Sequence, residues 1–392
     1  MSWRAWVTSL SAMGGGDNRV IAVTDTNQVR FNGNTVTIDP ANNLIFGRTY
    51  SVQMANGVIA DLGNHPYAGI ADAATLNFGT VPPVISLGRT FVLTPGIDNI
   101  TGTPGDDSII GLLVAGGSGG KLQTIQSADD IDGGAGNDSA ILEIIDADVP
   151  AVAPTITNVE VIDITFFPGD FDGDRALDMS HIDGVTSITV KVEGNTMREG
   201  QSFHLLNVGP VNNVSITGTS YSDLSITGLS ATHTTIDASA AIGDIRLGLS
   251  SIVHNLSVTG GSGNDVITGG SGVDNISGGA GADTFRFENG SSGLALGAID
   301  IVTDFISGTD HLNFGGSSGS ISNFRDAGDF VDYAAALANA NTVMRLSHGT
   351  VGYVFADNDI DVWVFVDNNQ DGGADLSIQL SGVTTIAATD II

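Results

Sequence analysis

The stretch GGSGNDVITGGSGVDNISGGAGADTFR, residues 260–286, decides the fold. It consists of three consecutive nine-residue units, each fitting G-G-x-G-x-D-x-U-x, where U is a large apolar residue. Three adjacent matches at five defined positions do not arise from glycine bias alone. The candidate metal-binding positions in these units are Gly260, Gly261, Gly263, Asp265, Gly269, Gly270, Gly272, Asp274, Gly278, Gly279, Gly281 and Asp283.

This pattern predicts a parallel β-roll. The glycines permit backbone angles that other residues avoid, so the first six residues of a unit form a tight turn. The next three form a short strand whose central side chain points inward. Two units make one coil, so turns eighteen residues apart stack, and only those at Gly260 and Gly278 form a complete pair. Their carboxylates and carbonyls would converge on a hard cation, for which calcium is the natural candidate.

An earlier cluster is more degenerate. Residues 93–101 (LTPGIDNIT), 102–110 (GTPGDDSII) and 133–141 (GGAGNDSAI) keep the aspartate, although Pro and Thr replace glycines in the first two. An insertion separates the first two from the third, and TIQSADDID at 124–132 keeps only its aspartate and its apolar residue. The candidate ligands here are Asp98, Asp107, Asp129 and Asp138.

A short-strand rhythm without aspartates precedes the three perfect units. Its apolar centres are Ile216, Ile226, Ile236, Leu247 and Val258, in steps of 10, 10, 11 and 11 residues. We therefore expect one β-solenoid over roughly residues 155–290, with the calcium turns at its C-terminal end.

Composition narrows the function classes. The 392 residues include 44 acidic and 13 basic side chains, a net charge of −31, which argues against nucleic acid as a partner. The acidic residues are 39 Asp and five Glu. Asp and Gly are typical turn residues, and Asp also supplies oxygen ligands for metals. Cysteine is absent, which excludes disulfides and thiolate metal sites. No apolar run has signal-peptide or membrane-span length, so we expect export without a cleaved N-terminal signal.

The nonapeptides resemble the calcium-binding repeats of RTX proteins, which bacterial type I secretion exports. The wider arrangement resembles RTX-type surface-layer and adhesin-like proteins, and the resemblance covers roughly residues 90–392. DIVTDFISGTDHLNF, residues 300–314, resembles the segment that closes many RTX domains, which implies Asp300, Asp304 and Asp310 as further ligands. The resemblance implies calcium as cofactor, the type I secretion apparatus as partner, and an extracellular or cell-surface location.

Residues 20–82 resemble part of a bacterial Ig-like sandwich, with about a third of the strands missing. We thus expect an all-β protein in four segments. These are a partial Ig-like sandwich (1–85), degenerate RTX repeats with an insertion (90–145), a β-solenoid ending in three RTX nonapeptides (146–290), and a small β-rich C-terminal secretion region with one helix (291–392).

Three smaller patterns lie outside the repeats. DNNQDGGAD, residues 367–375, sits between two predicted strands and favours a modified hairpin calcium loop, whose candidate ligands are Asp367, Asn369, Asp371 and Asp375. Its twelfth position is Ile378 rather than Glu. Residues 326–341 predict a helix whose apolar face comprises Phe330, Tyr333, Ala334 and Leu337. Asp170, Asp172 and Asp174 also alternate, but Arg175 replaces the expected glycine, which favours a solvated loop.

Little indicates an enzyme. The seven histidines form no H-E-x-x-H, and the G-x-S-x-G matches at 116–120 and 315–319 lie in glycine-rich loops without a strand-to-helix turn. We expect no catalytic residues and a structural or adhesive role at the cell surface, with other copies of itself or a surface polysaccharide as partner. Two alternatives are the C-terminal export fragment of a larger RTX protein and a carbohydrate-active or carbohydrate-binding protein on a solenoid scaffold. The incomplete sandwich favours the former.

Overall fold

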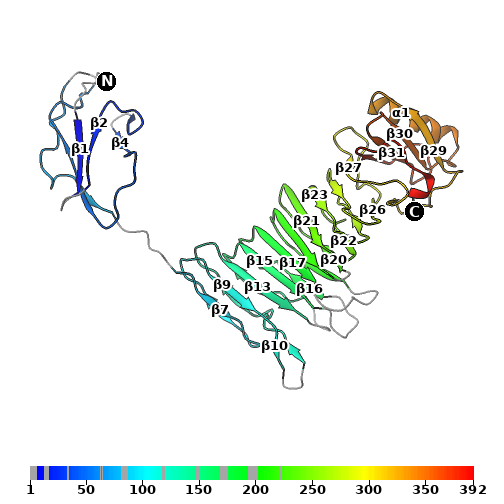
Figure 1. Cartoon of the computed structure of the whole chain (residues 1–392), viewed down its shortest axis with the longest axis horizontal. Coiled ribbons are helices and arrows are strands. Elements are labelled where there is room, and N and C mark those ends of the chain that lie inside the picture. The colour runs from blue at the N-terminus through cyan, green and yellow to red at the C-terminus, as the bar shows by residue number, and fades with distance from the viewer. Residues whose placement is uncertain are drawn as a thin grey trace. The chain divides into compact units, whose positions relative to one another are not determined.

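The computed structural model describes residues 7–12, 17–32, 35–61, 63, 65–80, 87–116, 120–145, 151–167, 175–192, 202–219 and 222–392 (Figure 1). The chain divides into two compact units, Met1–Ile85 and Ser86–Ile392. The all-β prediction is confirmed, since strands dominate both units and the described residues contain a single α-helix.

The first unit is built on an antiparallel sheet of four strands in the order β2-β1-β5-β6. These strands are β1 (Val7–Ala12), β2 (Asn18–Ala22), β5 (Thr49–Met54) and β6 (Asn77–Gly79). Within residues 28–40 (QVRFNGNTVTIDP), β3 (Val29–Asn32) pairs antiparallel with β4 (Thr35–Ile38). Ile21, Val29 and Met54 belong to the small apolar core between this strand pair and the sheet.

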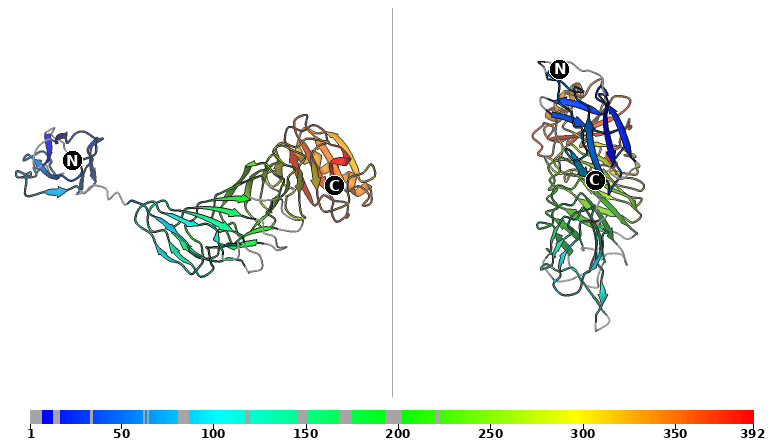
Figure 2. Two further views of the ribbon diagram at one scale, coloured as in Figure 1. Left: turned by 60° about the horizontal axis from the view of Figure 1, so that its bottom comes forward. Right: turned by 90° about the vertical axis from the view of Figure 1, so that its left-hand side faces the viewer.

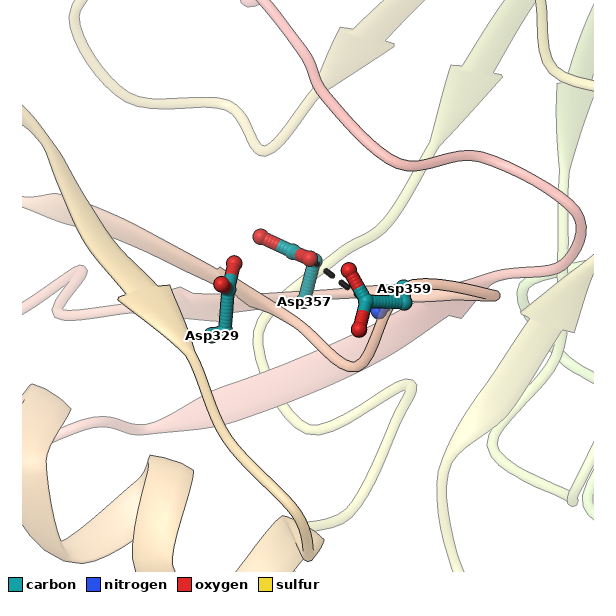
Figure 3. A group of neighbouring side chains, drawn as sticks. All are labelled: Asp329, Asp357 and Asp359. Atoms are coloured by element: carbon teal, nitrogen blue, oxygen red, sulfur yellow. Dashed lines mark hydrogen bonds between the residues drawn. The ribbon is translucent and has the colours of Figure 1, made fainter.

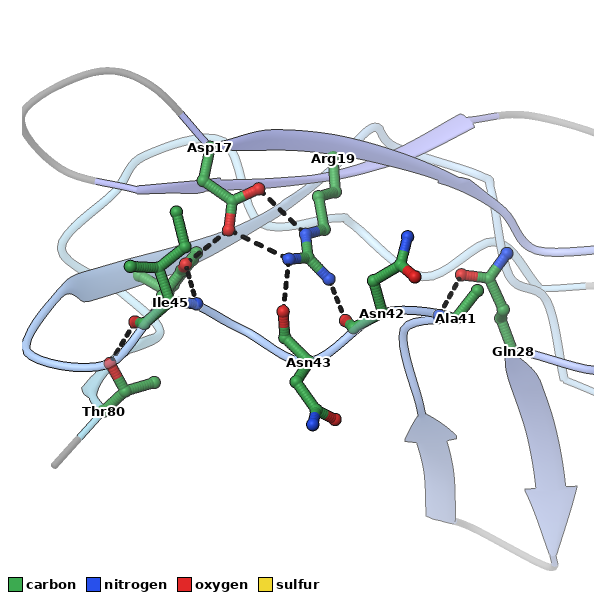
Figure 4. A network of polar contacts seen from close by, with 9 residues as sticks. Asp17, Arg19, Gln28, Ala41, Asn42, Asn43, Ile45 and Thr80 are labelled. Carbon is green, nitrogen blue, oxygen red and sulfur yellow. Dashed lines mark hydrogen bonds and ion pairs between the residues drawn. The ribbon is translucent and has the colours of Figure 1, made fainter. Parts of the chain in front are cut away.

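A polar network holds the loop before β5 in the first unit (Figure 4). The Asp17 carboxylate accepts hydrogen bonds from Arg19 Nε (2.9 Å) and from the hydroxyl of the fully buried Tyr50. Arg19 also donates to the carbonyls of Asn42 and Asn43. The hydrogen bond from Arg19 is the main reason that the pKa of Asp17 lies below its usual value.

The second unit is a parallel β-solenoid (Figure 1; Figure 2). One face is a 14-stranded sheet in the order β29-β30-β31-β32-β27-β25-β23-β21-β19-β17-β15-β13-β9-β7. The opposite strands form two sheets, β14-β12-β8 and β16-β18-β20-β22-β24-β26-β28. A two-stranded hairpin of β10 (Val114–Ala115) and β11 (Lys121–Leu122) interrupts the coils.

The strands of the 14-stranded sheet, in chain order, are β7 (Thr90–Val92), β9 (Ser108–Gly111), β13 (Ser139–Ile144), β15 (Val161–Phe166), β17 (Ser187–Val192), β19 (Asn213–Gly218), β21 (His233–Ala241), β23 (Asn255–Thr259), β25 (Asn275–Ser277), β27 (Asp300–Val302), β29 (Phe324–Asp329), β30 (Tyr353–Asp357), β31 (Val362–Val366) and β32 (Leu376–Leu380). Those of the opposite sheets are β8 (Asn99–Thr101), β12 (Asp130–Asp132), β14 (Thr155–Thr157), β16 (Arg175–Asp178), β18 (Phe203–Leu206), β20 (Ser222–Ile226), β22 (Ile245–Gly248), β24 (Val266–Thr268), β26 (Thr284–Arg286) and β28 (His311–Asn313).

The apolar centres predicted from the rhythm all point into the core. Ile216, Ile226, Ile236, Leu247 and Val258 are each at most 2% exposed, and so are the apolar residues of the three nonapeptides. Each nonapeptide strand pairs with the strand eighteen residues away, as Ile267 does with Phe285. Alternation of inward apolar and outward polar residues therefore fixes the register along the solenoid.

The solenoid is longer than the expected span of 155–290. Strands β7, β9 and β13 precede residue 155 and belong to the same 14-stranded sheet, as do strands after residue 290. The segments 90–145, 146–290 and 291–392 all contribute to it, and their separation within the second unit stays a prediction.

The predicted helix at 326–341 is shifted. Residues 324–329 form strand β29, and helix α1 spans Tyr333–Leu346, with Asp332 as its N-cap accepting from Ala335 N. Gly328, at φ +82°, and the cap exclude an earlier start, because neither has helical backbone angles. The buried residues of α1 are Tyr333, Ala336, Ala340 and Met344, so Ala334 was wrongly placed on the apolar face.

The last residues complete the solenoid. The short 3-10 helix η1 (Ala388–Asp390) leads into Ile391, which forms a parallel bridge to Leu312 of β28 and is buried in the main core. Within the described part of the chain, no helix has the length and apolar character needed to cross a membrane.

Candidate calcium-binding turns

The glycine turns stack as predicted. The Ala280 amide donates to the carbonyl of Gly261 (3.0 Å), which joins the turns that begin at Gly260 and Gly278. Gly279 has φ +94°, and a Cβ added there would lie 2.1 Å from the Gly261 carbonyl oxygen. A side chain at this position would therefore clash with the neighbouring coil as well as strain the backbone.

The aspartates of one edge form a ladder from coil to coil. Asp265 accepts from Gly261 N of its own turn (2.6 Å) and from Ile245 N of the preceding coil (2.8 Å). The Asp265 amide donates to Asp283 Oδ1 (2.8 Å), and the Asp283 amide donates to Asp310 Oδ1 (2.9 Å). Each carboxylate thus binds the backbone of the coil that precedes it.

The other edge repeats this arrangement. Asp274 Oδ1 accepts from Leu256 N (2.9 Å), and the Asp274 amide donates to Asp300 Oδ1 (2.9 Å). Asp304 accepts from Gly278 N (2.9 Å), so it closes the third nonapeptide turn. The structure therefore brings Asp300, Asp304 and Asp310 onto the edges that carry the repeats.

The degenerate cluster builds the same ladder. The Asp98 amide donates to Asp129 Oδ1 (2.9 Å), and the Asp107 amide donates to Asp138 Oδ1 (2.6 Å). The Asp138 amide in turn donates to Glu160 Oε2 (2.6 Å). Glu160 was not predicted as a member of this ladder, because it lies outside any nonapeptide. Its distance of 22 residues from Asp138 nevertheless equals the length of later coils, such as that from Val214 to Ile236.

Threonine takes over the role of a turn glycine in this cluster. Thr103 occupies the position of Gly261, and its amide and hydroxyl both donate to the Asp107 carboxylate. Thr94 and Asp98 make the same pair of contacts. The added hydroxyl bond holds the aspartate of the turn, which explains why the solenoid tolerates the missing glycines here.

Burial makes these carboxylates costly to ionise without a cation. Burial raises the pKa of Asp283 to about 6 and that of Asp300 to about 8. It also raises the pKa of four further carboxyl groups, those of Asp129, Asp138, Asp265 and Asp274. Among the described residues, Asp138 Oδ2 and Asp300 Oδ2 accept no hydrogen bond although both are buried. Buried carboxylate oxygens beside stacked glycine carbonyls fit a hard, oxygen-binding cation such as calcium.

Comparison with known families agrees with this geometry. Residues 94–112, 126–140 and 257–292 match the RTX calcium-binding nonapeptide repeat in four copies. The chain therefore carries RTX calcium-binding repeats. Residues 6–80 match a bacterial Ig-like domain, whereas no curated protein matches the chain. RTX repeats bind calcium, so calcium is the cofactor of these turns. RTX repeats and bacterial Ig-like domains are both typical of non-enzymatic structural proteins.

The predicted hairpin loop at residues 367–375 lies between β31 and β32. Asp367 is buried and accepts from Gly372 N (2.9 Å), and Asn369 Oδ1 accepts from Asp371 N (2.8 Å). Asp375 Oδ2 accepts from the amide of Asn369 (3.0 Å). The four predicted ligands therefore share one tight loop whose own amides engage their oxygens, and calcium binding here stays a prediction.

A second acidic group was not predicted from the sequence. Oxygens of Asp329, Asp357 and Asp359 lie within 4.8 Å of one another where β29 ends and β30 turns toward β31 (Figure 3). The charges of Asp357 and Asp359 raise the pKa of Asp329. The three residues share no sequence motif, and we assign no ion to them, because carboxylates gather at exposed turns without one.

Glu143 accepts from Leu113 N (2.7 Å) and so supports the coil before the β10–β11 hairpin. Asp170, Asp172 and Asp174 lie outside the described residues, as does part of the G-x-S-x-G match at 116–120.

Proposed function

We propose that this chain is a secreted calcium-binding RTX protein with a structural or adhesive role at the cell surface, and that it folds when calcium binds outside the cell. The observation that carries the proposal is the ladder of buried carboxylates, which holds the coils together and is costly to ionise alone. RTX repeat proteins are typically secreted, which supports the extracellular location.

The ladder gives calcium a direct role in folding. Asp265 and Asp283, with the carbonyls of the stacked Gly260 and Gly278 turns, would hold an ion on one edge. Asp274 and Asp300 would do so on the other, where Asp300 Oδ2 has no other partner. Because the turns form only in the folded chain, the free energy of calcium binding becomes folding free energy.

Charge supports export before folding. A net charge of −31 makes the calcium-free chain repel itself, which keeps it extended enough for a narrow type I channel. Calcium is abundant outside cells and would neutralise the carboxylates there. The Ig-like region supports the structural or adhesive role, since such domains are typical of non-enzymatic structural proteins.

The test is circular dichroism combined with analytical ultracentrifugation, as calcium is titrated into chelated protein. We expect a coil-to-β transition in the micromolar to millimolar calcium range and no transition with magnesium, which demands a tighter octahedral site. The double variant Asp265→Asn/Asp283→Asn should shift the midpoint to higher calcium. The control Asp163→Asn/Asp237→Asn removes the same charge from outward positions and should leave the calcium midpoint unchanged. Equal folding and heat stability in chelator and in calcium would overturn the proposal.

A further inference from the structure

Among the described residues of the second unit, no element covers the N-terminal end of the solenoid. Its outermost coil consists of β7 and β8, which pair only with β9 and β12 of the next coil among the described residues. Solenoid ends are normally closed by a capping element with a polar outer face, because an open end exposes core side chains and unpaired strand edges.

The core is open at this end. Phe91 heads the inward column that continues through Ile109, Ala140 and Ile162. These three residues are fully buried, whereas Phe91 is only half-buried. Ile100 likewise heads the column of the opposite sheet and is half-buried above a buried neighbour. Within the described part of the second unit, the apolar interior is thus open at this end.

The outer surface of this coil is apolar as well. Leu87, Val92 and Ile97 are 79%, 66% and 74% exposed. Residues 87–101 contain one basic and one acidic side chain, Arg89 and Asp98, in a chain whose net charge is −31. This neutral coil is therefore a face through which two strongly acidic copies could approach with little local repulsion.

Among the described residues, no strand pairs with the outer edge of β7. Arg89 and Leu93 direct their hydrogen bonds toward β9. Because alternate residues of a parallel edge strand face opposite sides, the amides and carbonyls of Thr90 and Val92 face away from the sheet. Antiparallel pairing about a twofold axis at Phe91 would set Thr90 opposite Val92 of the other copy, so that both residues satisfy their backbone groups.

We propose that this end of the solenoid docks a second copy of the chain, with the two β7 strands pairing antiparallel about a twofold axis. The open core columns, the neutral coil and the free edge of β7 all meet at this interface. The inference goes beyond the proposed function, and calcium-driven folding can hold whether or not the copies pair.

The test is sedimentation equilibrium of the full chain in saturating calcium, up to about 100 µM protein. We expect a monomer–dimer equilibrium whose dissociation constant rises at least about tenfold in Val92→Lys, because two like charges would face the interface. Val253→Lys, at a 76% exposed valine in the middle of the solenoid, should leave that constant unchanged. Circular dichroism in calcium checks that both variants fold.

Cross-linking provides a second measurement in this cysteine-free chain. Thr90→Cys/Val92→Cys should form disulfide-linked dimers on mild oxidation, since directly opposed residues fall within disulfide reach. Ser257→Cys/Thr259→Cys, at two outward positions of a central strand, should not. A wild-type chain that stays monomeric throughout, meaning that the end coil is covered within one chain, would overturn the inference. So would equal cross-linking of the two cysteine pairs.

Discussion

Replacing Asp390 with alanine should destabilise the C-terminal end of the solenoid by about 3–5 kcal/mol. The side chain is 1% exposed and accepts from Ser307 Oγ (2.7 Å), Gly308 N (3.1 Å) and Ala387 N (2.9 Å). Hydrogen bonds to a charged group contribute about 1.5–3 kcal/mol each and do not add fully, which sets this range. Asp304 caps Ser277 and Gly278 in the same way, so Asp390 is the last carboxylate of the ladder.

Urea unfolding in saturating calcium measures this loss of stability, and the fluorescence of the buried Trp363 reports on the C-terminal end of the solenoid, where Asp390 lies. Asp390→Asn keeps an acceptor and should lose about half as much stability as Asp390→Ala. Asp130→Ala removes an exposed carboxylate from β12 and serves as the control. If Asp390→Ala unfolds within about 0.5 kcal/mol of the wild type, the ladder does not end at this residue and the reasoning is wrong.

Three further predictions concern the turns. Gly279→Ala should lower the free energy of unfolding by about 3–5 kcal/mol. Gly290 has a similar φ but no atom within 4 Å of the added Cβ, so Gly290→Ala should lower it by only about 1 kcal/mol, and thermal unfolding in calcium compares the two variants. In chelator, stability should fall as pH rises from 4 to 8, because folding raises the pKa of Asp283 to about 6 and of Asp300 to about 8, and the folded chain therefore holds protons that the unfolded chain releases. Asp283 alone contributes about 3 kcal/mol below its unfolded pKa of 3.8, and this contribution is lost as the pH rises through about 6. A β-content, measured by circular dichroism in chelator, that rises with pH would contradict this sign. Thr103→Val should weaken the degenerate turn by about 1 kcal/mol through loss of its hydroxyl bond, while Thr103→Ser should not, as differential scanning calorimetry can show.

The repeat was readable because its chemistry is local. The nine-residue period predicts both which residues form the turn and which side chain points inward. The strands of 260–286 and their stacking could therefore be predicted from the sequence. The upstream apolar centres follow from the same alternation. The hairpin around residues 367–375 was equally clear, because two runs of β-formers flank a cluster of turn residues.

The features that were missed depend on contacts between distant residues. Glu160 joins the ladder only because the coil after Asp138 brings it back to the same edge. Helix α1 starts later than its apolar spacing suggests, because the preceding segment pairs with β30. The early coils were placed outside the solenoid because Pro and Thr obscure their turns, and only the structure shows Thr103 replacing a glycine by a hydroxyl bond.

The direction of the ladder gives the molecule a mechanical polarity. Each carboxylate binds the backbone of the coil before it. Among the described residues, the first coil is therefore held from one side only, by β9 and β12. A pulling force applied at residue 87 acts on that coil first. The force reaches the next coil only after the first coil has unfolded. A pulled molecule should therefore unravel in successive steps of one coil each, from about 18 to 31 residues long, and dissipate work gradually instead of rupturing at once.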